Sequence, residues 1–104
     1  MGTNAPNFFL PDSQLLRGSN YAAWKTKIKT QLEFEEIWPV VTGTLTRSPT
    51  DATQQRQFDR ADQKAKLIIL FGVSDDVQAH IRDATSAKEA WDKLSTIYEA
   101  KNKN

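Results

Sequence analysis

The sequence predicts an all-α fold, a compact bundle of about four to five helices preceded by an extended N-terminal arm. Three observations support this fold class. The 104 residues amount to one ordinary domain. Aromatic and aliphatic residues recur in several stretches at the three- and four-residue spacing of one helix face. Small polar residues of the kind that cap helices precede those stretches.

The expected organisation is an N-terminal arm at residues 1–14, a helical domain at residues 15–100 and a polar tail at residues 101–104. Two prolines disfavour a helix in the arm, because proline lacks the N–H donor and fixes φ. The arm also holds the apolar pair Phe8 and Phe9, which we expect to pack onto the domain. Its first seven residues are equally compatible with a leader that packs on nothing.

The first helix is expected at residues 21–37. A preceding Ser-Asn pair can cap its free N–H groups. The residue before a proline disfavours helical ψ, so the helix should stop at the Trp-Pro pair that follows. Four residues on successive turns form its core-facing stripe: Tyr21, Trp24, Ile28 and Leu32.

Residues 39–48 are expected to form a loop with Val40 and Val41 tucked inward, since a glycine and several threonines favour turns. The second helix then begins with Ser48 as N-cap and Pro49 in its first turn. A glycine at position 72 is expected to stop it. Its predicted core residues are Phe58, Ala65, Ile68 and Ile69.

Two further helices are expected towards the C-terminus. Residues 74–81 form a short one, with a serine cap and two aspartates at its positive end. The last helix opens with a capping box, Ser-Ala-Lys-Glu at residues 86–89. The core residues predicted for the two helices are Val77, Ile81, Trp91, Leu94 and Tyr98.

The residues predict no enzyme. The sequence has no cysteine, and its only histidine is His80, so the usual metal ligands cannot cluster. It also lacks a phosphate-binding loop, a dinucleotide fingerprint and a nucleophile elbow. We therefore expect no catalytic residue, no metal ligand and no cofactor. Fourteen basic residues face thirteen acidic ones, which gives little of the positive charge that drives binding to nucleic acids.

The location predicted from sequence is intracellular and cytoplasmic, with no membrane partner. The first sixteen residues lack the basic start and the apolar stretch of a secretion signal. The longest apolar run, at residues 67–73, is too short to span a bilayer.

Two sets of side chains are candidates for contacts with a partner. Tryptophan is enriched at interface anchors, and one tryptophan lies at a helix end where side chains are often half exposed. The candidate interface residues are Trp38, Phe8 and Phe9. The weak candidates for an RNA contact are Arg17, Lys25 and Lys29. A solvated helix surface is the favoured interpretation of these three residues, and the alternative is a weak contact with RNA or with an acidic face of another subunit.

Four segments carry a family likeness. Residues 16–25, LRGSNYAAWK, resemble the L-x-G-x-N-Y-x-x-W opening of Gag polyproteins from Ty1/copia-type LTR retrotransposons. Residues 37–43, IWPVVTG, are similar to the family's L-W-x-V-V-x-G. Residues 62–70 resemble its D-x-K-A-x-x-x-I helix, although phenylalanine stands just before it where many members have tryptophan. Residues 84–99 resemble A-T-S-A-K-E-A-W-D-x-L-x-x-x-Y-E, the most specific of the four.

The resemblance implies a structural capsid domain that contacts other Gag subunits in a homo-oligomeric lattice and contributes to virus-like particles. Family members continue into further helices, and some carry a Cys/His zinc knuckle for RNA. The resemblance is therefore to the N-terminal part of the capsid region, and RNA contacts would lean on regions that this sequence lacks. The alternative is a Gag-derived stand-alone module, retained by a host, that binds a peptide or protein partner or interferes with Gag assembly.

Overall fold

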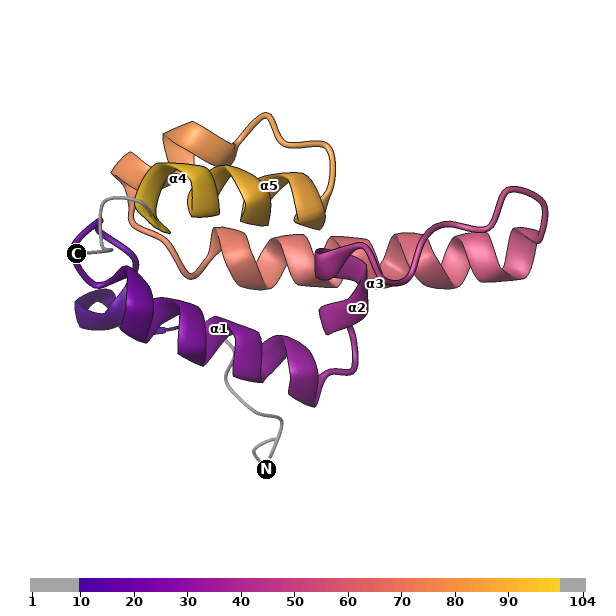
Figure 1. Cartoon of the computed structure of the whole chain (residues 1–104), viewed down its shortest axis with the longest axis horizontal. Coiled ribbons are helices and arrows are strands. Elements are labelled where there is room, and N and C mark those ends of the chain that lie inside the picture. Colours follow the sequence, from indigo (N-terminus) through magenta and orange to yellow (C-terminus); the bar gives the residue numbers. More distant parts are fainter. Residues whose placement is uncertain (1–9, 100–104) are drawn as a thin grey trace, which may run out of the picture.

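The computed structural model describes residues 10–99, and the α-helices in this part of the chain confirm the all-α fold. The helices are α1 (Tyr21–Phe34), α2 (Trp38–Thr42), α3 (Ala52–Leu70), α4 (Asp75–Ile81) and α5 (Ala87–Leu94). A 3-10 turn, η1 (Asp12–Gln14), precedes them, and a π-helical turn, η2 (Ser95–Glu99), follows them. In Figure 1, α3 lies between α1 on one side and α4 with α5 on the other.

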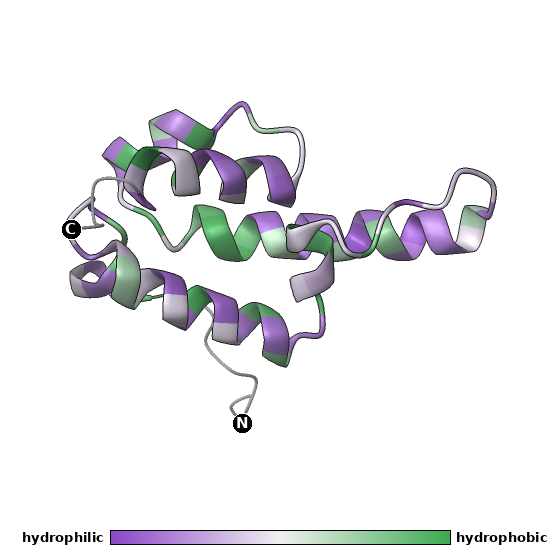
Figure 2. Ribbon diagram, viewed as in Figure 1, coloured by the Kyte–Doolittle hydropathy of each residue, from purple (hydrophilic) through white to green (hydrophobic). Residues whose placement is uncertain are grey.

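The core lies where the C-terminal half of α3 meets α1 and α5. Figure 2 shows that this half of α3 is apolar, whereas the N-terminal half is largely hydrophilic and extends past the other helices. Leu16, Val41 and Ala87 are also fully buried. The residues of the predicted core that the structure buries are Tyr21, Trp24, Ile28, Leu32, Ala65, Ile68, Ile69, Val77, Ile81, Trp91, Leu94 and Tyr98.

Phe58 is also predicted as core from its spacing, and that prediction is wrong. Its side chain is only half-buried and lies outside the core cluster. Its helical spacing is that of the core stripe, but it belongs to the half of α3 that projects beyond the other helices. Phe58 therefore has only the connection at residues 43–51 to pack against.

The predicted loop at residues 39–48 is also wrong in its first half, which forms α2 (Trp38–Thr42). Pro39 does not end the preceding helix, because α1 already stops at Phe34; it lies in the first turn of a new helix, where its missing N–H costs nothing. Val40 and Val41 are buried, as the sequence suggested. Gly43 ends α2 with a left-handed φ of 86°, which glycine adopts without strain.

The boundaries of the two long helices differ from expectation. α1 ends at Phe34 because Glu36 takes a left-handed φ of 63°, and the Ile37 N–H then bonds the Leu32 carbonyl at 3.0 Å. The N-cap of α3 is Asp51, which accepts from the Gln54 N–H at 3.0 Å.

Ser48, predicted as that cap, instead closes the turn before the helix. Its hydroxyl accepts from the Asp51 N–H at 3.0 Å. Pro49 therefore lies in the turn and not in the helix, which begins at Ala52. For the last two helices the serine caps are as expected, with Ser74 accepting from Val77 and Ser86 from Glu89.

The N-terminal arm is described only from residue 10 onwards, so Phe8 and Phe9 lie outside the described residues, as does the tail at 101–104. Within the described part, η1 interrupts the expected extended chain. Leu16 then pairs with Val73 in an isolated parallel bridge. This pairing ties the start of the domain to the connection between α3 and α4.

Candidate interaction surfaces

The turn in the first family-like segment, residues 16–25, is held by the side chain of Asn20. Its amide donates to the Leu15 carbonyl at 2.9 Å and its oxygen accepts from the Arg17 N–H at 3.0 Å. Gly18, with φ of 119°, lets the chain reverse between them. The asparagine therefore shapes the entry to α1 from within the chain.

Trp24 and Gly72 join α1 to the end of α3. The Trp24 indole N–H donates to the Gly72 carbonyl at 2.5 Å, and the Leu16 N–H donates to the same oxygen at 3.0 Å. A Cβ on Gly72 would lie 3.0 Å from Ile28 Cδ1 and 3.2 Å from Trp24 Nε1. A side chain at position 72 would thus push α1 away.

Asp62 on α3 caps a different helix. Its carboxylate accepts from the Ala87 N–H at 2.8 Å, at the first turn of α5. Ser86 caps the same turn, and Glu89 reaches back to the Thr85 N–H at 2.9 Å. Backbone N–H groups in the first turn of a helix need acceptors from outside that helix, and Asp62 supplies one here. The third and fourth family-like segments are therefore in direct contact.

Trp38, the predicted interface anchor, belongs partly to the core. Its ring stands edge-on to Trp91 with centroids 5.3 Å apart, and Trp91 stacks on Trp24 at 5.6 Å. Tyr21 continues this row of rings at 6.1 Å from Trp24. Trp38 remains half exposed at one end, where the Lys29 ammonium lies 5.6 Å from its ring centroid.

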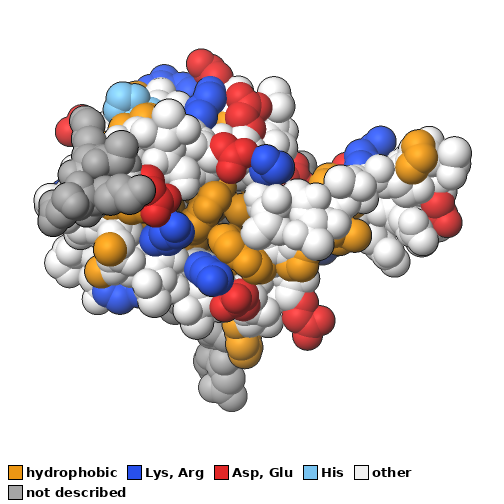
Figure 3. All heavy atoms as spheres, in the orientation of Figure 1, with side chains coloured by type: hydrophobic (Ala, Val, Ile, Leu, Met, Phe, Trp, Pro, Cys, Tyr) orange, Lys and Arg blue, Asp and Glu red, His pale blue; other side chains and the backbone are white. Residues whose placement is uncertain are grey.

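Each of the three candidate RNA-contact residues has a partner within the chain. Arg17 donates to the Asp12 carbonyl, and Lys29 lies over Trp38. Lys25 pairs with Glu99 at 3.1 Å. In Figure 3, basic side chains over α1 flank apolar side chains that are exposed at the centre of this face. Because each cation already has a partner, the three do not form a free basic patch.

The Glu99 carboxylate accepts hydrogen bonds from side chains near both ends of the domain. Besides Lys25, it accepts from the Tyr21 hydroxyl at 3.3 Å and from the Ser95 hydroxyl at 3.1 Å. The hydrogen bond from Lys25, helped by Ser95, holds the pKa of this carboxyl below its usual value. Burial raises the pKa of Tyr21, which keeps its hydroxyl protonated as a donor. This group of side chains fastens η2 to α1.

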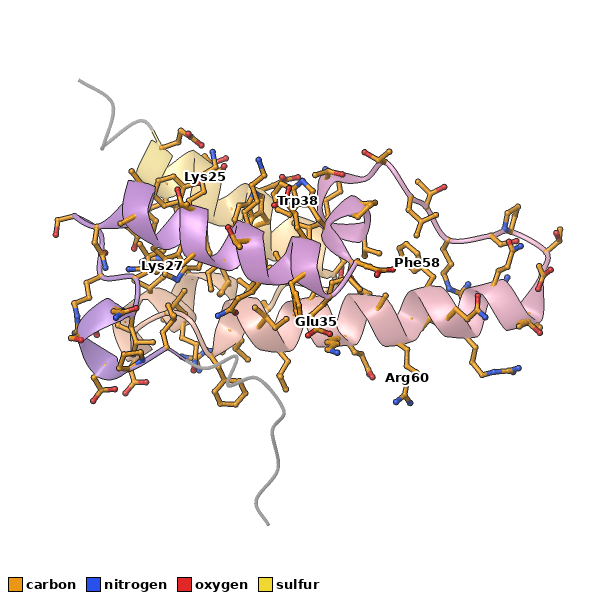
Figure 4. The ribbon with its side chains drawn as sticks, turned by 90° about the horizontal axis from the view of Figure 1, so that it is seen from below. Lys25, Lys27, Glu35, Trp38, Phe58 and Arg60 are labelled. Carbon is orange, nitrogen blue, oxygen red and sulfur yellow. The ribbon has the colours of Figure 1, made fainter. Side chains whose placement is uncertain are left out.

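The outer side of α3 carries basic charge that sequence reasoning missed. Arg56 and Arg60 lie one turn apart, and neither forms an ion pair with any residue between 10 and 99. Figure 4 shows Arg60 projecting from α3 away from α1, while Glu35 lies between the two helices. Glu35 forms an ion pair with Lys64 there. The available signal was the spacing of Arg56 and Arg60 opposite the core stripe.

The projecting half of α3 also bounds a small apolar groove. Leu45, Phe58 and Ala61 line it, with the connection at residues 43–51 forming its other wall. In Figure 4, Phe58 points from α3 towards that connection. The Arg47 ion pair with Asp59, at 2.9 Å, holds the connection along the helix and lowers the pKa of that carboxyl.

The described residues contain neither a metal cluster nor a membrane-spanning helix. Between residues 10 and 99, no three His, Cys, Asp or Glu side chains are grouped so that they can hold a metal ion. In the same part of the chain, no helix has both the length and the apolar character needed to cross a membrane.

Comparison with known families gives a match over most of the chain. The sequence model described as gag-polypeptide of LTR copia-type matches residues 28–104. Neither the curated proteins nor the solved structures gave a match. The matched range contains three of the four segments noted above and much of the chain from α1 to η2.

Proposed function

Because the chain belongs to the copia-type LTR gag-polypeptide family, we propose that it is a structural Gag domain that contributes protein–protein contacts to virus-like particles. The family match is the observation that carries this proposal. On this proposal the chain is the N-terminal part of the capsid region, its partners are other Gag subunits, and assembly takes place in the cytoplasm. No residue is assigned a catalytic, metal-binding or cofactor-binding role.

The positions of the family-like residues support the proposal that contacts with other subunits are made by the outer faces of the domain. Trp24 and Asp62 make contacts between helices and face inward. Residues of this kind maintain the fold that the family shares. The outer faces, where Phe34 and Leu45 are exposed, are then the parts that meet other subunits.

The test is the assembly of a Gag polypeptide that carries this chain. Light scattering should rise steeply with protein concentration, and electron microscopy should show closed particles. The matched control is the same polypeptide without residues 15–99, for which we expect no particles. Absence of concentration-dependent assembly in the first, or unchanged assembly in the second, would contradict the proposal.

A second candidate function is that of a stand-alone module that binds a peptide or protein partner or interferes with Gag assembly. The groove beside Leu45, Phe58 and Ala61 favours it, because its volume of about 310 Å³ suits an apolar side chain of an extended peptide. The Leu45→Asp variant should lose such a partner in a pull-down from the source cells. Recovery of Gag alone by the unaltered chain would argue against a separate peptide or protein partner.

A further inference from the structure

The end of α1 exposes an aromatic side chain within an acidic stretch of the sequence. Phe34 is 68% exposed, more than the other large apolar residues that are exposed in the described part of the chain. Glu33 precedes it in the chain and Glu36 follows two residues later, and neither forms an ion pair with any described residue. We call Glu33, Phe34 and Glu36 the α1 corner. A lone exposed aromatic is common, so its meaning depends on what surface lies beside it.

A groove with the opposite character lies directly beside this corner. Its volume is about 680 Å³, and Ile37, Ala61 and Leu67 provide its apolar lining. Arg60 is also among its lining residues and has no ion-pair partner among the described residues. We call it the α3 groove. It offers an apolar floor for a ring and a guanidinium for a carboxylate.

The corner and the groove share one surface. Glu35 and Ile37 line the groove and lie one and three residues after Phe34 in the chain. A surface with complementary parts side by side is self-complementary under a two-fold axis, because each part then faces the other part of the second copy. We infer that two copies of this chain form a two-fold dimer, in which the α1 corner of each copy docks in the α3 groove of the other.

Charge favours a second copy over other occupants. The carboxylates of the corner pair with Arg60 across the axis, and the same contact occurs twice. A nucleic acid is a poor occupant, since the phosphates would approach Glu33 and Glu36 as well as Glu35 on the groove wall. The inference deepens the proposed function and rests on it for its setting, because it names one subunit contact of the assembly.

Sedimentation of the whole chain over a concentration series tests the dimer. The unaltered chain should change from monomer to dimer as concentration rises, and added salt should weaken the association. Phe34→Ala, Glu33→Arg and Arg60→Glu should each raise the dissociation constant by about tenfold or more. The matched controls, Asp83→Arg and Arg82→Glu, make the same charge changes just after α4 and should leave it unchanged.

A mixing experiment tests the two-fold geometry. Glu33→Arg alone brings the new guanidinium against Arg60 in both contacts, and Arg60→Glu alone places two carboxylates together twice, so each variant should be monomeric. In a mixture, the new arginine of the Glu33→Arg variant faces the new glutamate of the Arg60→Glu variant in one contact, and native Arg60 faces native Glu33 in the other. The two variants should therefore form a heterodimer, and its absence would contradict the two-fold geometry. The double variant Glu33→Arg with Arg60→Glu restores an opposite-charge pair in both contacts and should dimerise again.

Circular dichroism of each variant should match that of the unaltered chain, since the side chains of Glu33, Phe34 and Arg60 are all exposed. This measurement separates loss of the dimer from loss of the fold. Recovery in the double variant is the result that a merely structural effect of either single change would not produce, because two destabilising changes would add.

The outcomes separate this inference from the proposed function. A chain that stays monomeric at all concentrations, variants that behave like their controls, or a double variant that stays monomeric would each overturn the dimer. None of these results touches the proposed function, which depends on particle assembly by Gag with and without residues 15–99. If Gag still formed particles without residues 15–99 while this chain dimerised, the capsid role would be rejected and the dimer would stand.

Discussion

At the scale of single residues, the packing of α1 against the end of α3 depends on Gly72, both on its carbonyl oxygen and on its lack of a side chain. The Gly72 carbonyl accepts hydrogen bonds from both Trp24 and Leu16. The α-carbon of the same residue faces Ile28 with no space for a side chain. Glycine is needed here because of packing, since its φ is not left-handed.

Gly72→Ala should destabilise the protein by about 1–3 kcal/mol, the usual cost of forcing a methyl group into a packed core. The added Cβ would lie 3.2 Å from the Ile68 carbonyl and from Trp24 Nε1, and neither atom is free to move. Urea unfolding followed by tryptophan fluorescence measures the change. Equal stability of Gly72→Ala and the unaltered chain would contradict the packing argument.

At the scale of helices, sequence patterns predicted the elements better than their contacts. The apolar stripes of α1, α3 and α5 and the serine caps of α4 and α5 are local features, so the sequence displays them directly. Sequence patterns do not predict α2, because a proline is usually expected to end a helix. Pro39 instead lies in the first turn of α2, after α1 has already ended at Phe34.

The contacts between elements were not predictable, because they join residues far apart in the chain. Asp62 and Ala87 are separated by 25 positions, and Trp24 and Gly72 by 48. Nothing in the local spacing marks these pairs. The α3 groove was not predictable either, because only the fold brings Ile37 beside Leu67.

Asp62→Ala should cost about 0.5–2 kcal/mol, the range for loss of a helix cap. The Ala87 N–H would lose its acceptor at the start of α5, where no helical carbonyl can replace it. Asp62→Asn keeps an oxygen in the same place and should lose less. The measurement is the melting temperature of the two variants. Equal decreases in melting temperature would mean that the charge of Asp62, and not its hydrogen bond, stabilises α5.

The attachment of η2 to α1 should weaken in acid. The pKa of Glu99 is lowered from its ordinary value of 4.5, chiefly by the hydrogen bond from Lys25. A carboxyl whose pKa is lower in the folded state stabilises the fold fully above its unfolded-state pKa. That stabilisation is lost as pH falls through the lowered folded-state value.

Glu99→Gln should therefore remove part of the loss of stability below pH 4.5 while leaving Tyr21 a partner. The measurement is the melting temperature of both proteins across that range. Parallel curves for Glu99→Gln and the unaltered chain would show that the ion pair contributes nothing. The effect is expected to be small, because both charges are exposed and screened by water.

At the scale of the whole molecule, stability and exposed surface are unevenly distributed along α3. Its C-terminal half contains Ala65, Ile68 and Ile69, all fully buried between α1 and α5. Its N-terminal half extends beyond the other helices, as Figure 1 shows, and contacts mainly the connection at residues 43–51. The same helix thus anchors the core at one end and presents an open surface at the other.

This asymmetry predicts the pattern of amide hydrogen exchange along α3. Amides at residues 56–60 should exchange about ten- to a hundredfold faster than those at 65–70, because local opening of the projecting half exposes little buried apolar surface. Arg47→Ala removes the ion pair with Asp59 and should speed exchange at 56–60 further, with no change at 65–70. Equal protection of both halves of α3 would contradict this prediction. It would mean that another surface packs against the projecting half in solution, and the dimer contact at Arg60 and Leu67 would be the first one to test. Repeating the exchange with Arg60→Glu distinguishes the two cases, since loss of the dimer should restore the gradient.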